Sequence, residues 1–157
     1  MKSFAWALVA SAVVLVGCTE GQWPEPRTLA ARQAARCGDE SSVAQERVAS
    51  PSNVEQVEPL YAIVDSTPNG QESRLLGAKL HLRPLRGETA ESMTHALYCH
   101  ETAEVLRGEG ACPYSVPDGW VDISVKSEGD GYVVKLEGQD FRQAKRILER
   151  AQAFAHN

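Results

Sequence analysis

Cysteine and histidine side chains are the groups in this sequence best suited to chemistry, and four of them lie close together. Cys99 and His100 are adjacent, His95 lies one helical turn before Cys99, and Cys112 follows shortly after. Thiolate and imidazole are ligands that copper and zinc prefer, so these four residues form a candidate site for metal handling or thiol redox chemistry. The sequence contains no Cys-x-x-Cys and no His-x-x-x-His pair. A disulfide, with a core histidine bonded to a backbone carbonyl, is therefore the competing interpretation.

Motifs of the common enzyme classes do not occur in the 157 residues. Gly-x-Ser-x-Gly, His-Glu-x-x-His, the Walker phosphate loop and the Gly-x-Gly-x-x-Gly pattern are all absent. The carboxylates of Glu88, Glu91, Glu101 and Glu104 are expected on the polar, solvated side of one helix. We therefore expect a protein that is not an enzyme and that uses no cofactor.

The elements that position these residues follow from the spacing of apolar side chains. Strands are indicated by alternation with a period of two, and helices by apolar stripes that recur every three or four residues. Thr89 and Asp140 are typical residues for the start of a helix. The predicted elements are two strands at 60–64 and 76–82, a helix at 89–107, a hairpin at 121–136 and a helix at 141–154.

This order of elements predicts an α+β fold. We expect a two-layer sandwich of ββαββα order, with two helices on one face of a mainly antiparallel four-stranded sheet. The arrangement resembles part of a ferredoxin-like fold, which by itself implies no function. Residues 18–56 lack a long apolar period and are predicted to be a flexible tether with one marginal helix at 29–36. A single folded domain is therefore expected at 57–157.

Basic side chains gather on the polar face of the predicted sheet. They are suited to an anionic partner, such as a cell-wall polymer or a lipid headgroup. A polar surface is also the usual composition of a solvated sheet face, so both interpretations stay open. The residues of this sheet-face set are Lys79, His81, Arg83, Lys126 and Lys135.

The net charge of the chain argues against one class of partner. The formal charge is -5 at pH 7. Non-specific binding to nucleic acid needs a basic surface that displaces counterions. Nucleic acid is therefore not expected as a partner.

The N-terminal residues have the three parts of a secretion signal. Lys2 is followed by an uncharged apolar run at 4–16 and by the small residue Gly17. The run is shorter than the roughly 20 residues that cross a bilayer. The sequence Leu15-Val16-Gly17-Cys18 resembles the lipobox of bacterial lipoproteins.

This resemblance implies cleavage between Gly17 and Cys18, loss of 1–17, and attachment of acyl chains such as palmitate to Cys18. The next residue is Thr19. The residue that favours retention at the inner membrane in Gram-negative lipoproteins is Asp, so we expect the outer membrane instead. The folded domain resembles small envelope lipoproteins that have no assigned activity.

The envelope is oxidising, so the remaining cysteines are expected to pair. A disulfide between Cys99 and Cys112 is predicted, because a chain that turns back after the helix brings them together. Pairing of Cys37 with either of them is the competing arrangement. We expect a lipid-anchored, non-catalytic binding or scaffolding module, with the membrane and either another envelope protein or an anionic cell-wall polymer as partners. The alternative is a metal-handling or thiol-redox module that uses Cys99, His100, Cys112 and His95.

Overall fold

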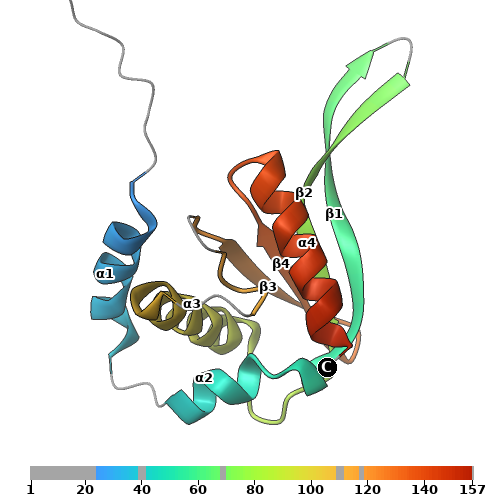
Figure 1. Cartoon of the computed structure of the whole chain (residues 1–157). Helices are drawn as coiled ribbons and strands as arrows, with labels where there is room; N and C mark the ends of the chain where they lie inside the picture. Colours follow the sequence, from blue (N-terminus) through green and yellow to red (C-terminus); the bar gives the residue numbers. More distant parts are fainter. Residues whose placement is uncertain (1–23, 39–41, 68–69, 109–111, 117–118, 157) are drawn as a thin grey trace, which may run out of the picture.

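The computed structural model describes residues 24–38, 42–67, 70–108, 112–116 and 119–156 (Figure 1). The predicted signal segment and Cys18 lie outside these residues. The elements, in chain order, are α1 (Pro26–Cys37), α2 (Ser42–Val48), the 3-10 turn η1 (Pro51–Asn53), β1 (Val54–Thr67), β2 (Gly70–Leu82), α3 (Ala90–Arg107), β3 (Asp122–Glu128), β4 (Gly131–Glu137) and α4 (Phe141–Ala155).

The four strands form one antiparallel sheet in the order β1-β2-β4-β3. The predicted α+β class and the four-stranded antiparallel sheet are therefore confirmed. Alternation in β2 buries Leu80 and Leu82 and leaves Lys79 and His81 half-exposed on the opposite face. One face of the sheet is thus committed to the core.

The outer halves of β1 and β2 extend beyond the body of the sheet. β2 pairs with β4 only over Gly77–Leu82, whereas it pairs with β1 along its whole length. Residues 61–67 and 70–76 therefore form a two-stranded ribbon, here called the arm, which projects from the domain (Figure 1). The sequence predicted only a short first strand and did not indicate this projection.

A single apolar core joins the sheet to α3 and α4. Both helices contribute fully buried side chains to the same cluster as Leu80 and Val134 of the sheet. Thr89 begins α3 through a capping box with Ser92, and the Asp140 side chain accepts the Gln143 backbone N–H at the start of α4. The core residues of the helices are Met93, Ala96, Leu97, Ile147 and Ala151.

The predicted ββαββα order with two helices on one face is not matched, because the described residues contain four helices. α1 lies along α3, and α2 also packs against α3 (Figure 1). The marginal helix predicted at 29–36 is present and longer, at 26–37, and residues 42–48 are also helical where a flexible tether was predicted. α1 buries only Ala30 completely, so its sequence carries no apolar stripe that would have revealed the docking.

Two further features bear on the surface of the molecule. Phe141 begins the helix predicted at 141–154, but it is the first residue of α4 and remains 59% exposed, outside the apolar stripe. The stripe instead begins at Ala144. Within the described part of the chain, no helix combines the length and the apolar character needed to cross a membrane.

Candidate functional site

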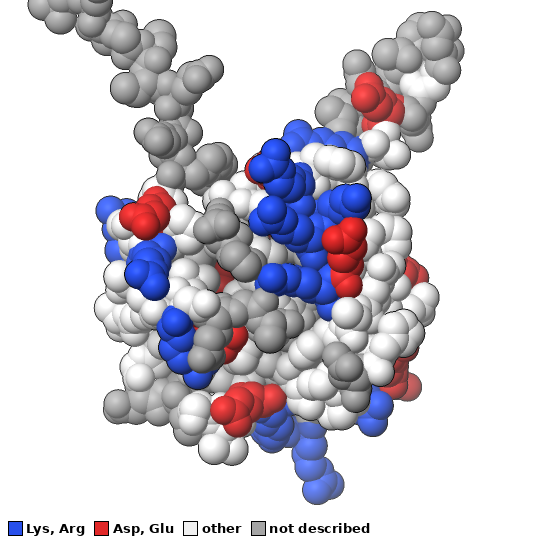
Figure 2. Space-filling view, in the orientation of Figure 1, with Lys and Arg blue, Asp and Glu red and all other residues white. Residues whose placement is uncertain are grey.

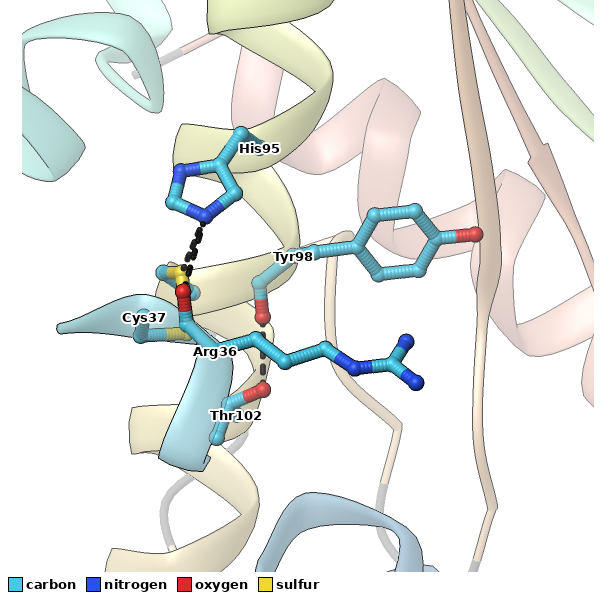
Figure 3. Close-up of a disulfide and its surroundings, with 6 residues drawn as sticks. Arg36, Cys37, His95, Tyr98 and Thr102 are labelled. Carbon is cyan, nitrogen blue, oxygen red and sulfur yellow. Dashed lines mark hydrogen bonds between the residues drawn. A yellow bond between two sulfur atoms is a disulfide. The ribbon is translucent and has the colours of Figure 1, made fainter. Parts of the chain in front are cut away.

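The disulfide joins Cys37 at the end of α1 to Cys99 in the middle of α3, so the predicted Cys99–Cys112 pairing is wrong (Figure 3). The competing arrangement with Cys37 is the one found. The two Cα atoms lie 5.5 Å apart although 62 positions separate the residues. Because α1 lies along α3, Cys37 reaches Cys99, while Cys112 lies beyond the end of α3. The bond ties α1 to α3.

The candidate metal site is not assembled. Cys99 is part of the disulfide, so it has no thiolate that could bind a metal ion. His95 has its Nε2 atom 3.2 Å from the Arg36 carbonyl oxygen and 3.9 Å from the Cys99 sulfur (Figure 3). In the parts of the chain that are described, no three His, Cys, Asp or Glu residues are grouped so that they could hold a metal ion.

His100 and Cys112 do come together, but in a form that disfavours thiol chemistry. The Cys112 sulfur lies 3.4 Å from His100 Nε2 and 3.7 Å from Ser115 Oγ. Burial raises the pKa of the Cys112 thiol and lowers the pKa of His100. Both groups are therefore held neutral, whereas a reactive pair needs thiolate beside imidazolium. The arrangement is that of a buried thiol hydrogen-bonded within the core.

Four of the basic residues predicted on the sheet face do share that face, but they are interspersed with acids. Lys79 lies opposite Lys135 in the register, and Val133 lies between His81 and Lys126 in the next row. Glu58 of β1 contacts Lys79 at 2.7 Å and lies 3.5 Å from His81 Nε2. The hydrogen bond from Lys79 lowers the pKa of Glu58.

Arg83 lies beyond the end of β2, where its backbone N–H bonds to the Asn53 carbonyl. A hollow of about 450 Å³ beside His81 is lined by three carboxylates, from Glu55, Glu128 and Asp130. Acids thus offset much of the positive charge of the sheet-face set.

A second hollow combines aromatic rings with arginine side chains. It measures about 430 Å³ and lies between α1, α3 and Trp120, two residues before β3. Tyr98 and Trp120 stack with nearly parallel rings, 15° apart, at a centroid distance of 6.5 Å. Arg36 extends from α1 in the same direction as Tyr98 (Figure 3). The lining residues are Leu29, Arg32, Gln33, Arg36, Tyr98 and Trp120, and we call this feature the Trp120 hollow.

Trp120 also borders an adjoining hollow of different chemistry. That space measures about 340 Å³ and is lined by Asp122, Glu137, Gly138 and Gln139 as well as by Trp120. Trp120 therefore borders guanidinium groups in one hollow and carboxylate and amide groups in the other. An apolar ring flanked by hydrogen-bonding groups is typical of small-molecule sites.

Side chains of α3 fix the backbone next to Trp120. The Tyr98 hydroxyl donates to Asp122 Oδ1 at 2.6 Å and accepts the Ile123 N–H at 3.1 Å. Glu101 Oε1 accepts the Val121 N–H at 2.7 Å. Ile123 lies in β3, which is an outer strand of the sheet, and Val121 directly precedes that strand. α3 therefore supplies hydrogen bonds that a neighbouring strand would otherwise give. The position of Trp120 is thus set by α3.

Glu101, which accepts the Val121 N–H, has an unusual charge state. It is completely buried, and burial raises its pKa from 4.5 to about 9. Its second oxygen, Oε2, is buried without a hydrogen-bond partner among the described residues. Burial also raises the pKa of Tyr98. Both side chains therefore stay neutral at physiological pH, which avoids a buried charge.

Sequence reasoning missed the main components of the Trp120 hollow. Glu101 and Glu104 were placed on a solvated helix face, yet Glu101 is fully buried and Glu104 is 8% exposed. The arginines of α1 were assigned to the predicted tether. The one available signal was the marginal helix at 29–36, which ends just before a cysteine.

A scan of protein-family models, a search of curated proteins and a search of solved structures found no match to this chain.

Proposed function

We propose that this chain is a lipid-anchored, non-catalytic binding module of the bacterial cell envelope, and that the Trp120 hollow is its ligand site. The ligand class is a sugar ring that carries a carboxylate or phosphate group, as in anionic cell-wall polymers. The observation that carries the proposal is the stacked Tyr98–Trp120 pair beside Arg32 and Arg36.

The chemistry of the lining residues supports this ligand class. The CH face of a sugar packs on an indole ring, while guanidinium groups bind carboxylate or phosphate with two parallel hydrogen bonds. Asp122 and Gln139 in the adjoining hollow offer acceptors and donors for sugar hydroxyls. The support from Glu101 and Tyr98 reduces the cost of ordering the site, since the backbone beside Trp120 is already held in place.

The ligand proposal is tested by calorimetric titration. The disaccharide of N-acetylglucosamine and N-acetylmuramic acid carries a carboxylate, and the N-acetylglucosamine disaccharide is its neutral counterpart. We expect saturable binding of the acidic disaccharide, abolished by Trp120→Ala and weakened to the level of the neutral sugar by Arg32→Gln with Arg36→Gln. Lys126→Gln on the sheet face is the matched control and should bind as the wild type does. Equal binding by the Trp120→Ala variant would refute the site.

The anchor proposal is supported by the lipobox-like sequence that ends at Cys18. With α1 beginning at Pro26, the eight residues from 18 to 25 span at most about 28 Å. The folded domain would therefore stand close to the lipid surface. Metabolic labelling with palmitate should mark the wild type and a Cys112→Ala control but not Cys18→Ala. Equal labelling of the Cys18→Ala variant would contradict the anchor without affecting the ligand site.

A further inference from the structure

The exposed face of α4 concentrates positive charge on an otherwise acidic protein. Arg142, Lys145 and Arg146 are exposed and lie together on this face, where Glu149 is the acid. Lys145 pairs with Glu149 only loosely, at 3.8 Å with both side chains exposed. Figure 2 shows the resulting basic cluster over α4. The three cations define what we call the α4 patch.

The fold makes little use of the α4 patch. The opposite side of the helix supplies the core contacts through Ala144, Ile147 and Ala151, all fully buried. Arg150, one helical turn after Arg146, donates to the Ser115 carbonyl oxygen at 2.8 Å and so has a structural contact. The cations of the patch point outward, where they meet solvent or a partner.

Large apolar side chains are exposed at the same end of the molecule. Phe141, beside Arg142 at the start of α4, is 59% exposed, and Tyr61 and Ile63 in the arm are 57% and 63% exposed. Alternation along β1 puts Tyr61 and Ile63 on the side of Val57, which packs against the core. The start of α4 and the arm both lie at the upper end in Figure 1, as does the start of α1.

We propose that the α4 patch, together with Phe141 and the arm residues Tyr61 and Ile63, docks on an anionic lipid surface. Cations attract the headgroups of anionic lipids, and exposed aromatic and aliphatic side chains enter the interface. The exposed apolar residues favour a membrane over a soluble anionic polymer, because a polymer neutralises charge without burying rings. A two-stranded ribbon is marginally stable alone in water, so contact with lipid would also stabilise the arm.

Docking is tested with the full chain carrying Cys18→Ala, so that no acyl chain contributes. The measured quantity is the ratio of the partition coefficients on vesicles of phosphatidylcholine with phosphatidylglycerol and on vesicles of phosphatidylcholine alone. Since each Lys or Arg near an anionic surface contributes about fivefold, Arg142→Gln, Lys145→Gln and Arg146→Gln together should lower the ratio about a hundredfold. The binding of the parent chain should also weaken as salt is raised.

A matched control removes two cations from the other face of the sheet, by Lys126→Gln and Lys135→Gln, and one from the end of β2, by Arg83→Gln. This variant has the same net charge as the α4 variant, and its ratio of partition coefficients should stay close to that of the parent chain. An equal loss in both variants would show that net charge and not the α4 patch is responsible, which would overturn the proposal.

A second pair of substitutions separates lipid from polymer. Phe141→Ser with Ile63→Ser should weaken binding to the anionic vesicles about tenfold while leaving the salt dependence in place. If these changes have no effect and dextran sulfate binds through the α4 patch as tightly as the vesicles do, the surface recognises a polymer and the lipid proposal fails. The urea midpoint of each variant establishes that it is folded.

Discussion

The buried carboxyl group of Glu101 makes the stability of this protein depend on pH in an unusual direction. Its pKa is raised from 4.5 to about 9, chiefly by burial and further by the nearby Asp122. Between these values the folded protein holds a proton on Glu101 that the unfolded chain has released. The contribution of Glu101 is therefore complete below pH 4.5 and is lost as pH rises towards 9, at about 1.4 kcal/mol per pH unit.

The substitution Glu101→Gln isolates this effect. Glutamine keeps the oxygen that accepts the Val121 N–H but does not titrate. The free energy of unfolding of the variant, relative to that of the wild type, should rise by about 4 kcal/mol between about pH 5 and about pH 8. The unpartnered amide hydrogens of glutamine add a cost that does not depend on pH, so the slope is unaffected.

The assay is urea unfolding followed by circular dichroism across this pH range. Glu91→Gln provides the control, because Glu91 lies on the exposed side of the same helix. The free energy of unfolding of that variant should differ from that of the wild type by the same amount at every pH. A constant difference between Glu101→Gln and the wild type would refute the reasoning, because it would mean that Glu101 is ionised in the folded state.

Three other predictions concern the disulfide, the free thiol and a glycine. Cys37→Ser should lower the free energy of unfolding by about 4 kcal/mol, which is the value that the chain-entropy model gives for a 62-residue separation. The variant should also expose α1 to trypsin. An unchanged urea midpoint would contradict this prediction. Cys112 should react with iodoacetamide only after unfolding, because its thiol is buried and its pKa is raised, and mass spectrometry of the native protein checks this. Gly77→Ala should cost about 3 kcal/mol or more, since a Cβ there would collide with the Leu136 carbonyl oxygen. Gly129→Ala, at a positive φ but in open space, should cost only about 1 kcal/mol in the same urea assay.

The sequence by itself determined the elements whose apolar pattern repeats at short range. Alternation in β2 identified the core side of the sheet, and the spacing of Ala144, Ile147 and Ala151 identified the buried side of α4. Thr89 and Asp140 marked the helix starts correctly. These signals are local, because period and capping depend on neighbours within one or two turns.

Only the tertiary structure decided what covers α3. The apolar residues of α1 are mostly alanines, and the helix docks through a disulfide and the small side chain of Ala30, neither of which produces a periodic pattern. Three candidate cysteines allow several pairings, and the approach of α1 selects one. The burial of Glu101 against the start of β3 depends on the same packing. Long-range contacts of this kind leave no trace in local sequence, which is why a helix face predicted to be solvated proved to support the candidate binding site.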